Sequence, residues 1–404
     1  MRRIVRRHKD NRHPPVVITG LCDTMSLCLI RNLGRRGIRI IATDSNISSY
    51  YGKSRYSQNI YCKSLFDRSL IELLCELGAS FDEKAVLFNC TDQSVLNVSR
   101  ERDKLQPFYN FVLPPHRTIE RLMSKKLFYD FALENNFLVP QTFFSHNSED
   151  IERVGRTISY PCIIKPEFKD SYWLTKVPVK VIYADSRKQY FELVKKYQIE
   201  EKSLVIQEWI DGDDTDLYFC LVYISRLHEP LVVFTGKKLR QHPHLAGTLS
   251  VAESVWVPEI AKESLRLLKT AGCVGFCSVE FKQSKKDGRF YAIEPTVGRP
   301  DSQEEICITA GLDVPYVAYL DAIGQDVAPL GGFKEGVKWI DVARIYYTVQ
   351  EYFRKTLTLK ELISFFRGKR SYSLWASDDP LPALFFAKEK MLAGIRKLFK
   401  SFRF

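Results

Sequence analysis

The chain has 404 residues, of which 45% are hydrophobic and 27% are charged, and its formal net charge is +12. This composition excludes a largely disordered chain and predicts two or three domains with ample material for a core. No apolar run is long enough to span a bilayer, and no hydrophobic signal segment follows the first residues. We therefore expect a cytoplasmic protein whose ten cysteines are reduced.

Residues 1–13 are predicted to form a flexible basic tail. They hold five arginines, one lysine and two histidines against a single aspartate. A targeting or nucleic-acid role for this tail is the less favoured alternative, and nucleic acid is not expected as a partner.

Residues 14–112 are predicted to form a Rossmann-like α/β domain. The strand PVVITG, the helix SLCLIRNLGRRG and the strand IRIIATDS form a β-α-β opening in which Gly20 permits a sharp strand exit. The glycine-rich G-x-G-x-x-G phosphate loop is missing, which disfavours the alternative that the chain is an NAD-binding oxidoreductase. Asp92 follows a later strand, at the edge where open parallel sheets bind ligands.

The segment from Val274 to Arg299 is predicted to be a β-hairpin that carries two glutamates, Glu280 and Glu294. A two-residue turn at its Asp-Gly pair would put the two carboxylates on opposite faces. A three-residue loop ending in a left-handed Gly288 would pair them on one face. The paired register predicts a Mg²⁺ site, because hard oxygen ligands suit that ion. The alternative is that one glutamate lies on the wet face of an edge hairpin.

A second domain is predicted over residues 113–330. The turn-like LPPHRT precedes it, and a helix is expected from Ile119 to Asn135. Lys165 follows on the apolar strand YPCIIKP. A lysine on a strand that is otherwise apolar needs an anion, so Lys165 is a candidate phosphate ligand.

Taken in order, these motifs resemble the ATP-grasp superfamily of carboxylate–amine ligases, including D-aspartate ligase-like proteins and carbamoyl-phosphate synthase large chains. The resemblance covers roughly residues 119–324. It implies two α+β subdomains that clamp ATP, with a lid over about residues 160–206. In SKKLFYDF, Lys125 matches the first phosphate lysine of the family, with Lys126 as its neighbour, and Lys165 matches the second.

The resemblance also implies which residues contact the base and the ribose of the nucleotide. The strand end QEWI implies a hinge whose backbone pairs with adenine, formed by Gln207, Glu208, Trp209 and Ile210. In the acidic run that follows, Asp214 matches the ribose ligand and Asp213 is the near alternative.

Two further positions of the resemblance concern the transferring phosphoryl group. In VVFTGKKLRQHPH, Lys238 and Arg240 alternate on one strand face and are expected to lie beside that group. His242 and His244 are expected to be solvent-facing loop residues rather than metal ligands.

The chain departs from the family pattern in two places. The lid segment PEFKDSYWLTKVPVKV has no glycine, so Lys169, Ser171, Trp173 and Lys176 would have to contact phosphate. After Glu294 the usual Glu-x-Asn-x-Arg becomes EPTVGR. Thr296 therefore takes the asparagine's place as a weaker metal ligand, and Arg299, one residue late, is expected to bind a substrate carboxylate or acyl phosphate.

The resemblance implies an ATP-dependent, ADP-forming ligase that activates a carboxylate as an acyl phosphate and joins it to an amine. Mg²⁺ is the expected ion, with Mn²⁺ as its substitute. The expected substrates are small molecules or cell-envelope precursors, such as an amino acid added to an envelope polymer. The alternative is an ATP-binding regulatory protein with little or no turnover.

Residues 331–404 are predicted to form a helical extension that ends in a basic amphipathic helix. Its apolar stripe comprises Leu384, Met391, Ile395, Leu398 and Phe402, widened by Phe385, Leu392 and Phe399. Six basic residues occupy other positions, with Glu389 as the only acid. The helix is expected either to lie on an anionic membrane surface, as a peripheral contact, or to pack on the protein itself.

Overall fold

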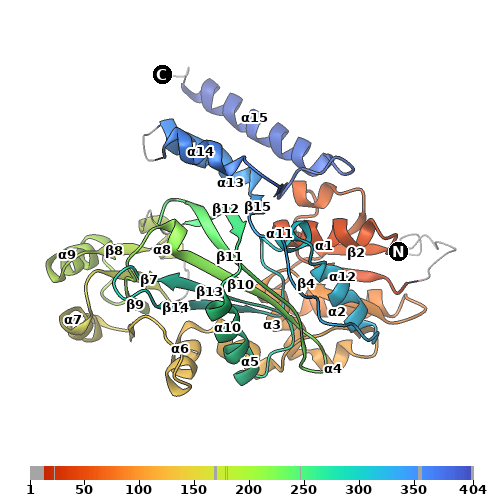
Figure 1. Cartoon of the computed structure of the whole chain (residues 1–404), viewed down its shortest axis with the longest axis horizontal. Coiled ribbons are helices and arrows are strands. Elements are labelled where there is room, and N and C mark those ends of the chain that lie inside the picture. The colour runs from red at the N-terminus through yellow and green to blue at the C-terminus, as the bar shows by residue number, and fades with distance from the viewer. Residues whose placement is uncertain are drawn as a thin grey trace.

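The computed structural model describes residues 13–21, 23–167, 171–177, 179, 181–245, 247–353 and 357–401. Nearly all of the predicted basic tail, the lid residue Lys169 and the end of the C-terminal stripe at Phe402 lie outside these ranges. Within them the chain builds three sheets with helices packed around them, and a group of helices at the C-terminal end (Figure 1).

The first sheet is parallel throughout and has the order β3-β2-β1-β4-β5. Its strands are β1 (Val16–Thr19), β2 (Ile40–Asp44), β3 (Ser57–Tyr61), β4 (Ala85–Asn89) and β5 (Tyr109–Asn110). The accompanying helices are α1 (Thr24–Gly34), the 3-10 helix η1 (Tyr50–Lys53), α2 (Arg68–Gly78), α3 (Asp92–Arg100) and α4 (Arg102–Leu105). Gly20, just after β1, has a φ of +98° and lies so close to Thr91 that a Cβ would clash.

The largest sheet has seven strands in the order β14-β13-β10-β11-β12-β15-β16. Its strands are β10 (Leu217–Ile224), β11 (Pro230–His242), β12 (Thr248–Ser254), β13 (Gly275–Gln283), β14 (Phe290–Val297), β15 (Lys338–Ile340) and β16 (Arg370–Tyr372). All neighbours are antiparallel except β15 and β16. The helices that pack beside it are α10 (Pro258–Thr270), α11 (Glu305–Ala310) and α12 (Val314–Ala322).

The third sheet is antiparallel and has four strands in the order β6-β9-β7-β8. These are β6 (Thr142–Ser145), β7 (Cys162–Pro166), β8 (Ile182–Ala184) and β9 (Leu204–Glu208), with the helices α7 (Ser148–Thr157), α8 (Ser171–Lys176) and α9 (Arg187–Tyr197). Figure 1 places this sheet as a separate lobe on the left.

The prediction of a single helix from Ile119 to Asn135 is wrong, because the helix is interrupted. The chain forms two helices there, α5 (His116–Met123) and α6 (Lys125–Glu134). Ser124 separates them because it takes an extended conformation and its hydroxyl caps α6 by accepting a hydrogen bond from Leu127.

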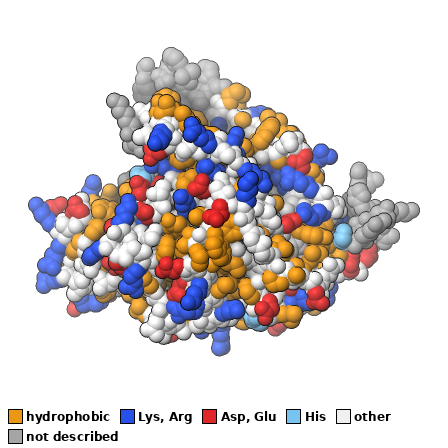
Figure 2. Space-filling model, viewed as in Figure 1, with side chains coloured by type: hydrophobic (Ala, Val, Ile, Leu, Met, Phe, Trp, Pro, Cys, Tyr) orange, Lys and Arg blue, Asp and Glu red, His pale blue; other side chains and the backbone are white. Residues whose placement is uncertain are grey.

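The C-terminal group comprises α13 (Val342–Phe353), α14 (Leu359–Phe365) and α15 (Leu381–Ser401). Figure 2 shows hydrophobic and basic side chains next to one another over this upper part of the molecule. No helix in the described ranges is both long and apolar enough to cross a membrane.

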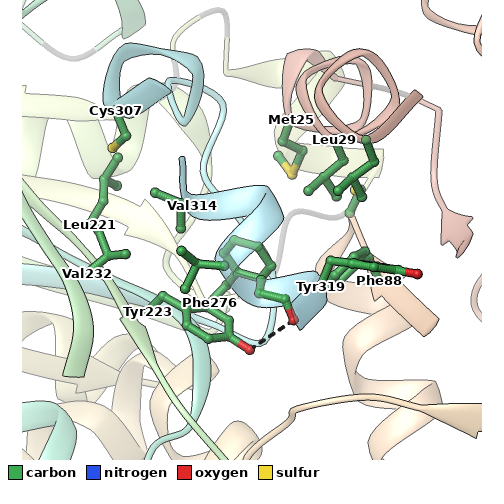
Figure 3. Close-up of a cluster of buried hydrophobic side chains, with 14 of the residues drawn as sticks. Met25, Leu29, Phe88, Leu221, Tyr223, Val232, Phe276, Cys307, Val314 and Tyr319 are labelled. Atoms are coloured by element: carbon green, nitrogen blue, oxygen red, sulfur yellow. Dashed lines mark hydrogen bonds between the residues drawn. The ribbon is translucent and has the colours of Figure 1, made fainter. Parts of the chain in front are cut away.

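The main core joins the first sheet to the seven-stranded sheet through α1, α11 and α12. Met25 and Phe88 from the first unit, Tyr223 and Phe276 from the large sheet, and Tyr319 from α12 converge there (Figure 3). The four-stranded sheet has its own core with α7 and α9. The small lobe and the large sheet are therefore built on separate cores. The mixed α/β class is confirmed, while the predicted domain limits at 112, 113, 330 and 331 stay predictions.

Candidate active site

A cavity of about 280 Å³ lies between the four-stranded sheet and the face of the large sheet. It brings together residues from strands that are far apart in the sequence. Nine of the residues singled out from the sequence line it: Lys125, Lys165, Gln207, Glu208, Trp209, Ile210, Lys238, Glu280 and Glu294.

The two glutamates of the hairpin lie opposite each other. Glu280 on β13 pairs with Glu294 on β14, which is the register that places both carboxylates on one face. The reason differs from the expected three-residue loop. Ser284 bonds to Arg289 across a longer turn, and the register shifts between Glu280 and Phe281, so a bulge restores the pairing. Gly288 is left-handed, as expected, with a φ of +72°.

This glutamate pair has the donor chemistry of a magnesium site. The Glu280 carboxylate accepts a hydrogen bond from the Lys238 ammonium at 2.8 Å, while Glu294 is exposed at the cavity. Thr296 lies two residues beyond Glu294 on the same strand and pairs with Ser278. Two carboxylates and a hydroxyl on one sheet face are hard oxygen donors, and they fit Mg²⁺.

Two lysines, Lys125 and Lys165, line the cavity where the small lobe meets the large sheet. Lys165 on β7 donates to the Gln207 side chain at 3.2 Å, and Gln207 in turn donates to Thr142 at 2.8 Å. The Lys125 ammonium, at the start of α6, lies 3.1 Å from the backbone oxygens of Pro166 and Glu167. Both side chains thus bring positive charge to the cavity wall, on polar partners that a phosphate group could replace.

The predicted hinge, residues 207–210, lines the cavity, and its backbone N–H groups differ in how they are bonded. The backbone N–H groups of Glu208 and Trp209 are used, since they donate to Gln141 and Pro161. The Ile210 N–H has no backbone acceptor within the described part of the chain, and Ile210 lines the cavity. A base that accepts a hydrogen bond at Ile210 would complete it.

Arg240 does not lie beside Lys238, and that prediction is wrong. The pairing of β11 with β12 shifts by one residue between Lys238 and Arg240, so strict alternation fails there. Arg240 is buried and forks onto Glu351 of α13 at 2.7 and 3.0 Å. Gln241 lines the cavity in its place.

Asp214 is not placed as a ribose ligand, which corrects a second prediction. Its buried carboxylate accepts hydrogen bonds from the backbone and side chain of Gln241, the ring of His244 and the backbone of Leu245. Burial acts to raise the Asp214 pKa, but these hydrogen bonds outweigh it and hold the pKa below its ordinary value. Asp213 is exposed and does not line the cavity either.

The two histidines are not plain solvent-facing residues. His244 contacts Asp214 at 2.8 Å and Asp213 at 3.3 Å, and these three form a compact cluster of metal-ligand type. His242 ends β11, bonds to Glu351 at 2.9 Å and stacks on Tyr347. Their partners come from segments 30 and 109 residues away, which local sequence pattern does not reveal.

Arg299 lies away from the cavity, where the large sheet meets the first sheet. It donates to Asp92 at the start of α3, and its guanidinium is 3.6 Å from Asp301. Asp301 accepts a hydrogen bond from Ser278, the strand neighbour of Thr296, and burial raises its pKa. Arg299 and Asp92, both marked from the sequence, are therefore brought together next to Asp301, whose partner Ser278 lies two strand positions from Glu280.

Lys282 is a cavity residue that the sequence reasoning missed. It lies two positions after Glu280 on β13, and its ammonium donates to the Asp213 backbone and lies 5.9 Å from the Trp209 ring centre. Burial lowers its pKa, an effect that the neighbouring Asp216 opposes. The sequence signal for Lys282 is its spacing from Glu280, because residues two positions apart on a strand lie on the same face.

The lid residue Trp173 also departs from expectation. It is buried in the core of the four-stranded sheet, so it cannot close over phosphate from this position. Lys176, at the end of α8, is exposed.

No protein-family model matches the chain. Among curated proteins, it is 21% identical to the D-aspartate ligase of Enterococcus faecium over 245 residues, which cover 57% of each chain. It is 24% identical to the carbamoyl phosphate synthase large chain of Thermomicrobium roseum over 312 residues, 73% of this chain and 28% of that one. The chain thus spans between about a quarter and about three-fifths of these relatives.

Solved structures match over most of the chain. An ADP complex of the N5-carboxyaminoimidazole ribonucleotide synthetase purK has a TM-score of 0.63 at 13% identity, over 85% of this chain and 86% of its own. A Hydrogenobacter thermophilus biotin carboxylase domain with MgADP and bicarbonate scores 0.61 at 14% identity, covering 78% and 71%. The L-amino acid ligase of Bacillus licheniformis scores 0.57 at 16% identity, covering 78% and 75%. The chain therefore has the ATP-grasp fold, and it resembles the ATP-grasp carboxylate–amine ligases as its sequence motifs predict.

Proposed function

We propose that this chain is an ATP-dependent, ADP-forming ligase that phosphorylates a carboxylate and joins the acyl phosphate to an amine. The observation that carries the proposal is the cavity itself. It gathers four lysines, Lys125, Lys165, Lys238 and Lys282, around a pair of facing glutamates. Phosphoryl transfer needs positioning and charge neutralisation more than a protein nucleophile, and this set of residues supplies both.

The division of labour follows from position. The Ile210 backbone and the Trp209 ring bind the base at the hinge end, while Lys125 and Lys165 hold the phosphates at the junction of the lobes. Glu280, Glu294 and Thr296 would hold Mg²⁺, with Mn²⁺ as a substitute, and the bound ion would neutralise phosphate charge. Lys238, at 2.8 Å from Glu280, supplies positive charge where the transferring group would lie.

The carboxylate and the amine are proposed to bind where the large sheet meets the first sheet. Arg299 is the cation there, and its planar guanidinium suits a carboxylate or an acyl phosphate. Asp92 and Asp301 lie around it and suit an ammonium group. A substrate with both charges, such as an amino acid, matches this arrangement. D-Aspartate ligase and L-amino acid ligase among the similar proteins support that class.

A coupled assay for ADP and phosphate across a matrix of carboxylates and amines tests the proposal. ADP should appear only with both substrates and a divalent ion. Glu294→Gln keeps the side-chain volume but removes a ligand charge, so it should lower turnover by about a hundredfold or more while leaving the fold unchanged. Full turnover by Glu294→Gln at saturating Mg²⁺ would show that the metal site is assigned wrongly.

The regulatory alternative predicts a different result in the same assay. A pure nucleotide sensor would be stabilised by ATP and Mg²⁺ without releasing ADP, whatever amino acids are pooled with it. The replacement of the family asparagine by Thr296 is the observation that favours it. Wild-type ADP release that disappears in Glu294→Gln would exclude this alternative.

A further inference from the structure

Exposed hydrophobic side chains are concentrated on the C-terminal group of helices. Of the twenty large hydrophobic residues that are exposed in the described part of the chain, eleven lie between residues 346 and 392, a small fraction of its length. Such a concentration marks an interaction surface. These residues are Tyr346, Phe353, Leu359, Ile363, Phe366, Trp375, Leu381, Leu384, Phe385, Met391 and Leu392.

Helix α15 contacts the protein through Phe386 and Lys390 and exposes other side chains between them and beyond them. Phe386 is buried against η1, where its ring lies 5.2 Å from that of Tyr50. Beyond it, Met391 is 61% exposed and Leu392 is 40% exposed, and Leu384, 54% exposed, lies two turns before Met391. Figure 1 shows α15 as the outermost helix of the group. In the described part of the helix, Leu384 and Met391 of its apolar stripe therefore face outward, as does Leu392.

Helix α14 repeats this arrangement on a smaller scale. Leu359, Ile363 and Phe366 are spaced by four and three residues, which places them on one helix face, and all three are exposed. Arg367, Lys369 and Arg370 follow directly and are exposed as well.

The charge of this surface is positive because its acidic residues already have partners within the protein. Asp379 is buried against Arg31 at 2.9 Å, and Asp378 pairs with Arg35 at 2.8 Å. Glu361 caps its own helix through Thr358. Of the acids on α14 and α15, this leaves Glu389 to oppose a larger set of exposed basic residues, namely Lys360, Arg367, Lys369, Arg370, Lys388 and Lys390.

We propose that the exposed faces of α14 and α15, as far as residue 393, form a docking surface for an anionic lipid membrane. Leu384, Met391 and Leu392 would enter the boundary between headgroups and acyl chains. Lys388 and Arg367 would remain at the level of the lipid phosphates. Apolar side chains interleaved with basic ones suit that boundary, since both the hydrocarbon and the negative surface attract them. The proposal is independent of the ligase reaction.

Vesicle co-sedimentation of the full chain tests this surface. Vesicles of phosphatidylglycerol should carry the protein down at low salt, vesicles of phosphatidylcholine should carry little, and added salt should release it. The double variant Met391→Gln/Leu392→Gln should have an affinity for these vesicles at least about tenfold lower than that of the wild type. The reason is that two apolar side chains no longer enter the boundary. Lys388→Glu/Arg367→Glu should weaken binding and remove its dependence on salt.

Leu227→Gln is the matched control, because Leu227 is 65% exposed on the turn between β10 and β11, away from the docking surface. It should bind as the wild type does. Equal sedimentation of the wild type and both double variants would overturn the proposal. A wild-type dimer in solution that Met391→Gln/Leu392→Gln makes monomeric, without vesicle binding by either, would assign the surface to a second copy of the chain instead.

Discussion

The role of a single charged residue in this chain depends on whether it faces the cavity or a partner within the protein. Lys165 faces the cavity from an apolar strand and donates to Gln207. Lys165→Met keeps the aliphatic stem, so the melting temperature without ligand should hold or rise. The thermal shift produced by ATP and Mg²⁺ should largely vanish, because a phosphate contact is lost. Thermal unfolding with and without nucleotide measures both effects.

The exposed lysine Lys126 provides the comparison for that experiment. It pairs with Asp130 on its own helix and is half exposed. Lys126→Met should therefore leave the ATP shift unchanged. If Lys165→Met melts early yet gains the full ATP shift, Lys165 is structural.

Glu304 gives the protein a predictable dependence of stability on pH. It is buried, and burial followed by the nearby Asp301 raises its pKa to about 8. A carboxyl whose folded pKa is raised stabilises the fold at low pH, and that stability is lost as pH rises from about 4.5 through about 8. Glu304→Gln keeps the shape and cannot ionise. Its free energy of unfolding should therefore exceed that of the wild type at pH 9, by an amount on the order of 5 kcal/mol, and nearly equal it at pH 4.

Urea unfolding curves of the wild type and Glu304→Gln between pH 4 and pH 9 measure how the difference in their free energies of unfolding changes with pH. A difference that grows toward low pH, or that is constant, would contradict the assignment of Glu304. The exposed Glu149, in the first turn of α7, is the matched position, and Glu149→Gln should show no such growth toward high pH.

At the scale of elements, two bulges decide which side chains meet, and this limits what sequence can predict. The identity of the strands follows from composition and period. The pairing of Glu280 with Glu294 is one of two registers that the sequence leaves open, and the bulge between Glu280 and Phe281 produces it. A shift of one residue between Lys238 and Arg240 does not follow from composition and period, because it depends on contacts with β12 and α13. Asp214 was misassigned for the same reason, since its partners Gln241 and His244 lie on another strand and loop.

The bulge in β11 predicts opposite phenotypes for two neighbouring basic residues. Lys238→Met should lower turnover by at least about tenfold with little change in stability, since its ammonium serves the cavity. Arg240→Met should instead lower the free energy of unfolding by about 3 kcal/mol, because it removes the guanidinium that forks onto the buried Glu351. Steady-state kinetics and urea unfolding of both variants separate the two. Equal losses of turnover with intact stability would restore the original strand-face prediction.

At the scale of the whole molecule, a buried ion pair helps to join the segment before α15 to α1 beside the first sheet. Arg31 on α1 and Asp379 are 2% and 0% exposed, and Asp379 also accepts from Ser54 and the backbone of Arg55. Sequence reasoning did not reveal this link, because its two halves are 348 residues apart. It connects the predicted extension to the predicted opening domain rather than to the strands nearest in sequence.

Breaking this link should separate the stability of the C-terminal helices from that of the catalytic cavity. Asp379→Asn leaves Arg31 buried without a counter-charge, which should cost about 3 kcal/mol or more. The exposed neighbour Asp378 pairs with Arg35, and Asp378→Asn should cost about 1 kcal/mol or less. Hydrogen exchange should then speed up in α13 and α14 of Asp379→Asn, while ATP still protects β7 and β9. Unchanged exchange in α13 and α14, with loss of ATP protection, would show that the ion pair supports the cavity and not the attachment of the helices.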